Sequence, residues 1–312
     1  MMFVEQGIKS ENKFWKYIVG SIVIVLASTI GQIPLMGAVI YSAYQDNVAI
    51  PTDQNEILKV LDSNVTLFLI MISFVFAIIG IVFVLKFLHF QSLKEIITSR
   101  EKIDWKRVFF SFFVWSLFSI GSTLLMYFAN PSNFIFNFKL IPFLILFCIA
   151  TLMIPIQTTC EELVFRGYLM QGFGNLAHNK WFPLVMTSVI FGVMHIFNPE
   201  VEKMGYIILV YYIGTGFLLG IITLMDEGME LSIGFHAANN LIGALLVTTD
   251  WSVFQTHSIL IDTSEPTASI DIILPVILIY PILLFIFSKK YGWTNWKEKL
   301  TGTALLFNKI HE

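Results

Sequence analysis

Eight apolar segments, each near the length of a membrane-spanning helix, account for most of this chain. A helix that crosses a bilayer needs about 20 mostly apolar residues. The candidate segments are 15–43, 65–88, 108–129, 141–172, 182–198, 205–225, 231–249 and 270–288. Because lipid offers no partners to backbone N–H and C=O groups, such segments fold as helices. The sequence therefore predicts an all-α fold, a polytopic membrane helix bundle of about eight transmembrane helices.

Composition supports a membrane protein and gives its expected orientation. Only 13% of the 312 residues are charged, against about 25% in soluble domains. Most basic residues lie in the N-terminal tail, the second connection and the C-terminal tail, which share one side if the number of spans is even. Cytoplasmic loops carry an excess of lysine and arginine. We therefore expect an integral, multi-pass protein with both termini cytoplasmic, and the low-charge, Phe- and Ile-rich composition suggests a bacterial inner membrane.

The chain divides into three predicted parts. Residues 1–139 hold N-terminal transmembrane helices and a connector, 140–250 hold the core, and 251–312 hold an outer loop, the last helix and a cytoplasmic tail. The connector, 91–107, alternates charged and apolar residues, which is typical of a helix lying on the inner membrane surface and equally of a solvated connector. The sequence has no basic patch with interleaved aromatic residues, the pattern typical of nucleic-acid binding, so we expect no nucleic-acid partner. The lipid bilayer is an expected partner.

Three short motifs place polar side chains inside the apolar segments. They are Glu161-Glu162 with Arg166, Phe191 with His195, and His236 with Asn240. Ionisable groups at bilayer depth are costly, so they tend to face a protein interior or a wet cavity and to mark function. Carboxylate and imidazole together are the usual groups of general acid–base chemistry. The three motifs therefore predict one shared site.

The spacing within the motifs predicts how these side chains divide their roles. Glu162 and Arg166 are four residues apart on a helix, so they share a face and can form an ion pair. Glu161 is rotated by about 100° from Glu162. We therefore predict a buried Glu162–Arg166 pair and a working acid at Glu161. The alternative is that both acids pair with Arg166 only to hold the bundle together.

Helix geometry also predicts which residues meet. With a rise of about 1.5 Å per residue, Glu161 and His195 lie about 16 Å and about 20 Å from the inner ends of their segments. These similar depths predict that the two side chains can meet across an antiparallel helix pair. The site is expected to open toward the cytoplasmic side. His236 and Asn240, four residues apart, project from one helix face and can both donate hydrogen bonds.

The motifs resemble those of the CPBP family. Glu-Glu-x-x-x-Arg, Phe-x-x-x-His and His-x-x-x-Asn occur in this order within residues 140–248. The family includes CAAX prenyl proteases of the Ras-converting type and bacterial bacteriocin-processing or immunity proteins, also called Abi proteins. The resemblance implies a glutamate-type intramembrane endopeptidase that acts on a membrane-associated peptide or protein.

The resemblance also implies a role for each motif residue. Glu161 and His195 would activate a water, and His236 and Asn240 would donate hydrogen bonds to the developing oxyanion. Supporting roles, structural or orienting, would fall to three further residues: Glu162, Arg166 and Phe191. No cofactor or metal is implied.

Four alternatives remain open at this stage. Two histidines and a glutamate are a plausible zinc set, although no His-Glu-x-x-His is present. Cys160, next to Glu161, is a candidate nucleophile, although a cysteine in an apolar helix is usually a small core residue. A proton-coupled transporter would also use intramembrane acids and histidines, but the two halves show no repeat. The last alternative is a non-catalytic membrane immunity or binding protein.

Overall fold

The computed structural model describes residues 2–9, 12–266 and 272–304 of the chain. The first half contains η1 (Val4–Gly7), α1 (Phe14–Gln45), α2 (Gln54–Lys59), α3 (Ser63–Val84), η2 (Leu85–His89), α4 (Leu93–Ile97), α5 (Trp105–Ala129), η3 (Pro131–Asn133), β1 (Phe134–Phe136) and α6 (Leu140–Glu162). The second half contains η4 (Leu163–Leu169), α7 (Met170–Ala177), α8 (Trp181–Val193), α9 (Pro199–Met204), α10 (Ile208–Asp226), α11 (Glu230–Leu246), β2 (Val247–Thr248), β3 (Leu260–Asp262), η6 (Pro275–Ile279), α12 (Tyr280–Tyr291) and α13 (Trp296–Thr301). The predicted all-α class is confirmed.

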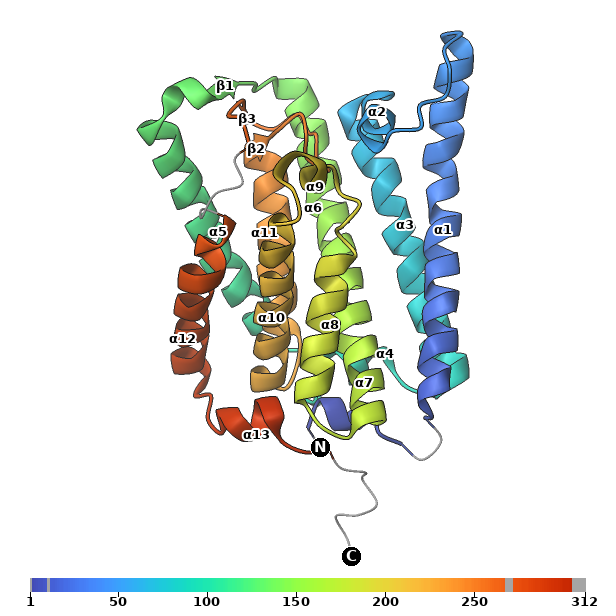
Figure 1. Ribbon diagram of the computed structural model, residues 1–312, viewed down its shortest axis with the longest axis vertical. Helices are drawn as coiled ribbons and strands as arrows, with labels where there is room; N and C mark the ends of the chain where they lie inside the picture. The colour runs from blue at the N-terminus through green and yellow to red at the C-terminus, as the bar shows by residue number, and fades with distance from the viewer. Residues whose placement is uncertain (1, 10–11, 267–271, 305–312) are drawn as a thin grey trace, which may run out of the picture.

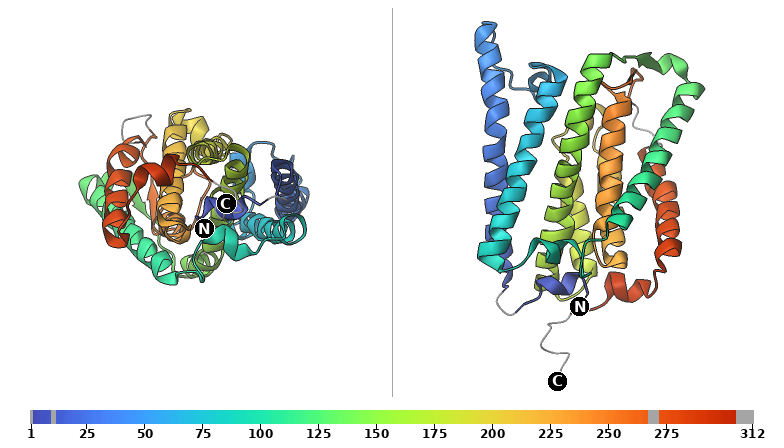
Figure 2. Two further views of the ribbon diagram at one scale, coloured as in Figure 1. Left: turned by 90° about the horizontal axis from the view of Figure 1, so that it is seen from below. Right: turned by 180° about the vertical axis from the view of Figure 1, so that it is seen from behind.

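The long helices run roughly parallel to one another through the molecule (Figure 1). Seen end-on, α1 and α12 lie at opposite edges of the bundle (Figure 2, left). α6 and α11 pack side by side at its centre (Figure 2, right), α6 also packs against α3, and α11 also packs against α5. The helices that carry the acid pair and the His236 motif are therefore central.

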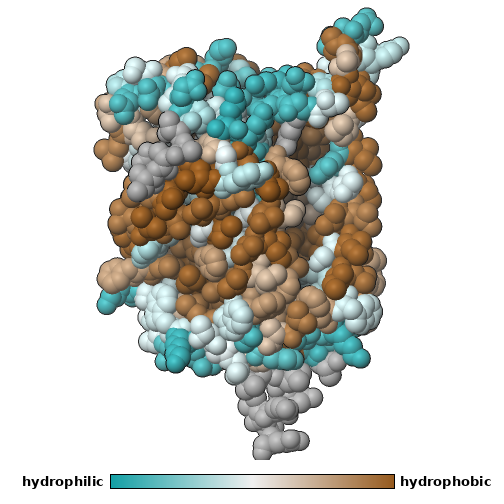
Figure 3. Space-filling view, viewed as in Figure 1, coloured by the Kyte–Doolittle hydropathy of each residue, from teal (hydrophilic) through white to brown (hydrophobic). Residues whose placement is uncertain are grey.

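An apolar belt surrounds the bundle. Its middle is covered by exposed apolar side chains, while polar residues gather at both ends (Figure 3). Five described helical segments are long and apolar enough to cross a membrane: Phe14–Gln45, Ser63–His89, Trp105–Ala129, Leu140–Ala177 and Ile208–Asp226. These features agree with an integral membrane protein that crosses the bilayer several times.

The predicted number of about eight spans is not established by length and composition. Trp181–Val193 is a shorter apolar helix, and α11 has 17 residues. The last predicted segment, 270–288, begins in residues 267–271, which lie outside the described residues, as does the tail from 305 onward. The described part of that segment contains η6 and most of α12.

Aspartates start two of the long helices. The Asp62 carboxylate accepts a hydrogen bond of 2.9 Å from the Asn64 N–H before α3, and Asp104 accepts one of 3.0 Å from the Lys106 N–H before α5. First-turn N–H groups have no partner within a helix, so a side-chain oxygen at this position stabilises the start. The starts of α3 and α5 therefore follow from local sequence.

The segments near both chain ends meet at one end of the bundle. η1, α4 and α13 lie there, and the three strands lie at the opposite end (Figure 1). The Phe3 N–H donates to Glu227 Oε2 at 2.6 Å, and Lys299 Nζ lies 3.3 Å from Glu227 Oε1. Glu227 thus ties both terminal segments to the turn after α10. We call this region, the end that holds η1, α4 and α13, the terminal end.

Of the two interpretations of residues 91–107, the surface helix is wrong. Helix is present only over Leu93–Ile97 and again from Trp105, where α5 begins. Ile96 is fully buried, and the Ile97 carbonyl accepts a hydrogen bond of 2.8 Å from the Met229 N–H. These isoleucines are covered by protein and not by lipid, because the turn between α10 and α11 lies directly against them.

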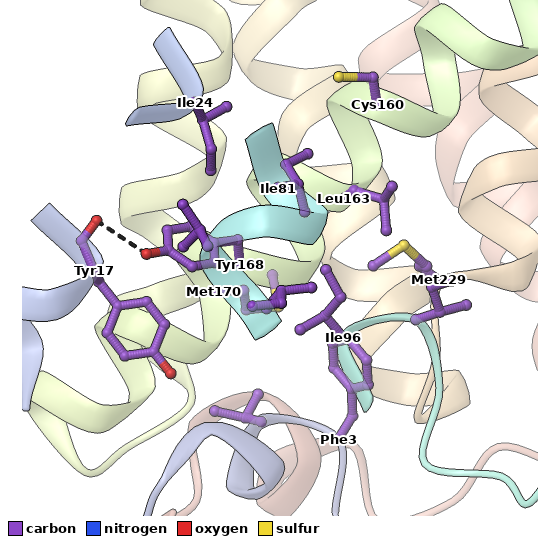
Figure 4. Packing of buried hydrophobic residues seen from close by; sticks show 14 of the residues in the cluster. Phe3, Tyr17, Ile24, Ile81, Ile96, Cys160, Leu163, Tyr168, Met170 and Met229 are labelled. Atoms are coloured by element: carbon purple, nitrogen blue, oxygen red, sulfur yellow. Dashed lines mark hydrogen bonds between the residues drawn. The ribbon is translucent and has the colours of Figure 1, made fainter. Parts of the chain in front are cut away.

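An apolar cluster fills the terminal end below the acid pair. Figure 4 shows Phe3 packed together with side chains of α1, α3, α4 and η4, and Cys160 of α6 is also part of the cluster. Tyr168 donates a hydrogen bond of 3.3 Å to the Tyr17 carbonyl across it. At the opposite end, β3 pairs antiparallel with β1 and parallel with β2. The space between these two ends contains the candidate site.

Candidate active site

The three motifs converge on one cavity inside the bundle. Glu161 lies in the last turn of α6, His195 follows α8, and His236 and Asn240 lie on α11. These four side chains, together with Phe191, line a cavity of about 610 Å³. Mostly apolar residues of α1, α3 and α10 form other parts of its wall. The structure thus brings together the residues that the sequence assigned to one site.

Glu162 and Arg166 form a buried ion pair beside the cavity. Their side chains have no exposed surface, and Arg166 Nη1 lies 3.1 Å from Glu162 Oε1. Arg166 Nη2 donates to the Gly216 carbonyl at 3.3 Å, and the guanidinium carbon lies 4.3 Å from the centre of the Phe191 ring. The predicted i,i+4 pair is present. It joins η4 to α8 and α10, because its arginine contacts both.

Glu161 faces the cavity from the end of α6. Its side chain is 17% exposed, whereas Glu162 is fully buried. Gln157, one turn earlier, donates a hydrogen bond of 2.5 Å to Glu161 Oε1. Glu161 Oε2 lies 3.5 Å from His236 Nε2. Glu161 Oε1 is therefore held by a short hydrogen bond from Gln157, whereas Oε2 has one long contact, with His236.

His236 lies between the two acids. Its Nδ1 is 2.8 Å from Glu162 Oε1, and its Nε2 faces Glu161 Oε2. An ionised carboxylate only accepts hydrogen bonds, so Nδ1 carries a proton in this contact. The sequence did not predict the His236–Glu162 bond, because it joins helices that are far apart in the chain. The buried pair is therefore a triad of Arg166, Glu162 and His236.

His195 lies in a turn and not in a helix, contrary to the predicted segment 182–198. α8 ends at Val193. The His195 ring Nδ1 hydrogen-bonds the Phe191 carbonyl at 2.7 Å, while the His195 backbone N–H donates to Gly192 instead. In a continuing helix that N–H would donate to the Phe191 carbonyl. The Asn198-Pro199 step also disfavours helix at Asn198.

The turn fixes the His195 imidazole so that one ring nitrogen can still accept a hydrogen bond. A carbonyl oxygen only accepts, so Nδ1 carries the proton and Nε2 of the neutral ring is an acceptor. The ring stacks on Tyr212 with 4.2 Å between centroids. Within the described residues Nε2 makes no protein hydrogen bond. Glu161 and His195 share the cavity wall, as the depths predict, but they are not hydrogen-bonded to each other.

Asn240 is held by Gln157 across the interface of α6 and α11. Asn240 Nδ2 donates to Gln157 Oε1 at 3.1 Å, which leaves its second N–H without a protein acceptor among the described residues. Gln157 is 4% exposed. Gln157 was not among the predicted site residues, although the sequence carries a signal for it: a polar amide lies one helical turn before the acid pair in an apolar segment.

Two further polar residues of the cavity wall were missed. Tyr212 supports His195, and Glu200 lies on α9, outside the spanning helices. Burial raises the pKa of Glu200, although its Oε1 accepts a hydrogen bond of 3.0 Å from the Val253 N–H. No motif marks either residue, because Tyr212 lies on α10 and Glu200 on α9, and only tertiary packing brings them to the cavity wall.

The alternative chemistries find less support in the arrangement. Within the described ranges, no three His, Cys, Asp or Glu side chains are grouped as ligands for one metal ion. Both nitrogens of His236 already face carboxylate oxygens. Cys160 borders the cavity but is 2% exposed, and no hydrogen bond joins it to a histidine in the described part of the chain.

The cavity extends away from the terminal end, which corrects the expected direction of opening. Its wall includes residues of the opposite end: Asn198, Glu200, Val247, Ser252, Val253 and Phe254. Toward the terminal end, the apolar cluster of Figure 4 closes the bundle. Helix rise predicts the depth of a residue in the bundle. Which end of the bundle is filled by side chains depends on the packing of segments that are far apart in the sequence.

Comparison with known proteins agrees with the motifs. The family model Rce1-like, described as type II CAAX prenyl endopeptidase Rce1-like, matches residues 137–242. The uncharacterized protein YyaK of Bacillus subtilis (strain 168) is 31% identical over 249 residues, which cover 79% of this chain and 82% of that protein. No solved structure matches the chain. The chain belongs to the Rce1-like family of type II CAAX prenyl endopeptidases, which is a family of proteases.

Proposed function

We propose that this protein is a glutamate-type intramembrane endopeptidase, with Glu161 as its general base. The observation that carries the proposal is the position of Glu161. Its carboxylate faces a cavity that it shares with His195, His236 and Asn240, while the neighbouring Glu162 is neutralised by Arg166. A carboxylate within reach of a bound water can accept its proton as the water attacks a carbonyl carbon.

The proposed reaction has two steps. First, the water oxygen bonds to the carbonyl carbon, its proton passes to Glu161, and the carbonyl electron pair moves onto oxygen. The free N–H of Asn240 and the His236 imidazole would donate to this oxyanion, and such donors stabilise the transition state by about 3 kcal/mol each. Second, the C–N bond breaks and the proton on Glu161 passes to the leaving nitrogen, which restores the carboxylate.

His195 would hold the attacking water together with Glu161. Its Nε2 has an available lone pair, and its ring is fixed at both the Phe191 carbonyl and the Tyr212 ring. A water that donates one hydrogen to Nε2 and the other to Glu161 would present its oxygen to the substrate.

The substrate would be a short extended segment of a membrane-associated peptide or protein. A volume of about 610 Å³ is in the range of small-molecule sites, so it admits a few residues and not a folded helix. The apolar walls from α1 and α3 fit a lipid-proximal segment. CAAX-like processing of a prenylated protein and processing of a bacteriocin or pheromone, with a role in immunity, are the two candidate uses.

Two further properties belong to this proposal. The reaction would need no metal, and cleavage would therefore resist chelators. The terminal end, which holds most of the basic residues, would face the cytoplasm of a bacterial cell. With that orientation the cavity extends toward the outer side of the membrane. Labelling of single cysteines at Lys297 and Thr263 with a membrane-impermeant reagent tests the orientation, since only the second should react in intact cells.

The deciding experiment measures metal content and peptide cleavage on the same purified protein in detergent, for wild type and Glu161→Gln. Lipidated and unlipidated membrane peptides serve as substrates. Cleavage by metal-free wild type, with a loss of at least about a hundredfold in the folded variant, is the expected result. Full activity in Glu161→Gln would overturn the mechanism. Loss with chelator and rescue by zinc would point to a metalloprotease, and no cleavage by wild type would favour a non-catalytic role.

A further inference from the structure

A continuous chain of side-chain hydrogen bonds connects α5 to Glu161. Trp115 Nε1 donates to Asn239 Oδ1 at 3.1 Å, and Asn239 Nδ2 donates to Asn240 Oδ1 at 3.0 Å. Asn240 Nδ2 donates to Gln157 Oε1 at 3.1 Å, and Gln157 Nε2 donates to Glu161 Oε1 at 2.5 Å. The chain crosses three helices, α5, α11 and α6. Every member gives its N–H to the next, so the chain has a direction.

The two ends of the chain determine that direction. The indole of Trp115 has an N–H and no acceptor, and an ionised carboxylate has acceptors only. Each amide between them has two orientations, related by a flip of its oxygen and nitrogen. Only one orientation of Asn239, Asn240 and Gln157 places a donor opposite an acceptor at all four contacts. The Trp115 indole at one end and the Glu161 carboxylate at the other therefore favour the same orientation of Gln157.

This orientation of the amides determines which groups of Asn240 and Glu161 remain available to a substrate and a water. The Asn240 oxygen is turned toward Asn239, so its NH₂ group is directed to Gln157 and retains one free hydrogen. The Gln157 N–H holds Glu161 Oε1, so Oε2 is the carboxylate oxygen left for a proton from water. The reverse orientation would set the Gln157 oxygen against the Glu161 carboxylate, a contact that is favourable only when Glu161 is protonated.

We propose that Trp115, Asn239 and Gln157 are positioning residues that set the orientation of Asn240 and keep Glu161 available as a base. The inference rests on the proposed function for its catalytic consequence. A purely structural role is the competing explanation, since hydrogen bonds between polar side chains also hold membrane helices together. That role would change stability without changing the protonation behaviour of Glu161.

The test uses two variants and a matched control. Gln157→Leu removes the contact with Glu161, and Trp115→Phe removes only the distant indole donor. The control is Trp293→Phe, because Trp293 is also a buried indole, 8% exposed against 5% for Trp115, and donates to Asp226 at 3.0 Å. The control loses a comparable hydrogen bond in the same apolar cluster but is not connected to Glu161.

The main readout is the pH dependence of Glu161 labelling by dicyclohexylcarbodiimide, followed by mass spectrometry. This reagent takes the proton of a protonated carboxylic acid and adds to its oxygen, so labelling requires no substrate. Other titratable groups surround Glu161 and are the same in all variants: His236 on α11, Cys160 and Glu162 on α6, Arg166 on η4, His195 after α8, Tyr211 and Tyr212 on α10, and Glu200 on α9. The lining residues of α1 and α3 are uncharged.

The expected result is a graded shift of the labelling midpoint toward higher pH. One charge-assisted hydrogen bond corresponds to about one pH unit for Gln157→Leu, with a smaller shift for Trp115→Phe and none for Trp293→Phe. The value of kcat should fall about tenfold in Gln157→Leu, with little change in KM. The inference is overturned if both variants keep the wild-type midpoint, if the control shifts equally, or if the midpoint moves while kcat does not. A wild type that cleaves no peptide removes the catalytic half of the inference, and the labelling still decides the orientation.

Discussion

Two polar clusters lie in this apolar bundle, and they differ in how completely their charges are paired. At the terminal end, Asp226 accepts hydrogen bonds from Arg100, Arg107 and Trp293, and Glu230 accepts from Arg100. In the cavity, no arginine or lysine forms an ion pair with Glu161 within the described residues. The acids of the first cluster are paired with basic residues of the same cluster. In the second cluster, Glu161 has no such partner and can still bind a ligand.

The difference indicates what each cluster does. A buried charge without a partner is costly, so a fully paired network is what a scaffold requires. A group that faces a cavity with unused capacity is suited to bind or to react. The Glu162 triad resembles the first cluster in its charge pairing, although Glu162 Oε2 and Arg166 Nε have no hydrogen-bond partner within the described residues. It also touches the second cluster, since His236 contacts both acids. The following predictions separate the two clusters by experiment, from the largest effect to the smallest.

Glutamate-to-glutamine changes in the two clusters should have opposite effects. Glu161→Gln should lose cleavage by at least about a hundredfold and keep its unfolding temperature. Glu230→Gln removes a fully buried partner of Arg100 and should cost about 2 kcal/mol of unfolding free energy, with activity per folded molecule retained. Peptide cleavage measures the activity of the two variants, and thermal unfolding in detergent measures their stability. Equal loss of stability in the two variants would break the comparison.

Removal of the buried arginine should destabilise the protein strongly. Arg166→Met leaves Glu162 buried with only His236 as a partner, so the free energy of unfolding should fall by about 3–5 kcal/mol. Arg107→Met is the matched control, because Arg107 is 18% exposed and Asp226 keeps Arg100. Its loss should be smaller. Unfolding titrations in mixed detergent compare them, and a larger loss in the control would contradict the assignment.

Close contact between the α8 and α10 backbones should also hold the cavity wall in place. A Cβ at Gly216 on α10 would lie 2.7 Å from the Ser188 carbonyl oxygen on α8. Gly216→Ala should therefore separate the two helices and cost about 1–3 kcal/mol. At Gly121 a Cβ would meet nothing within 4 Å, so Gly121→Ala should not destabilise. Unfolding temperatures of the two variants decide whether backbone packing supports the site.

The smallest effect is expected at an exposed ion pair. His257 Nε2 lies 3.1 Å from Asp62 Oδ2, and the Asp62 side chain is 56% exposed. Burial is the largest single effect and raises the pKa of Asp62, but the hydrogen bonds from His257 and the Asn64 N–H together lower it by more, so the net pKa is below its usual value.

A lowered folded pKa sets the sign of the pH effect. The stabilisation is present above the ordinary aspartate pKa and is lost as the pH falls through the lowered value. Asp62→Asn keeps a side chain that can start α3 and should change stability by less than about 1 kcal/mol at neutral pH. A difference from wild type that grows on acidification would contradict this assignment.

The sequence alone determined the helical membrane fold, because twenty apolar residues in lipid have few alternatives to a helix. It also predicted the Glu162–Arg166 pair, since that contact depends only on residues four apart on one helix. The shared location of Glu161, His195, His236 and Asn240 followed from polar groups that need a protein interior or cavity. Each of these results depends on local periodicity or on the cost of polar groups in lipid.

Tertiary structure alone decided the contacts between segments. It placed His236 between the two acids, ended α8 before His195, and joined Trp115 to Glu161 through three amides. Tertiary packing also filled the terminal end with apolar side chains, so the cavity extends toward the opposite end of the bundle. Local sequence cannot decide these features, because each depends on which atoms of distant helices are nearest and on which orientation satisfies every hydrogen bond at once.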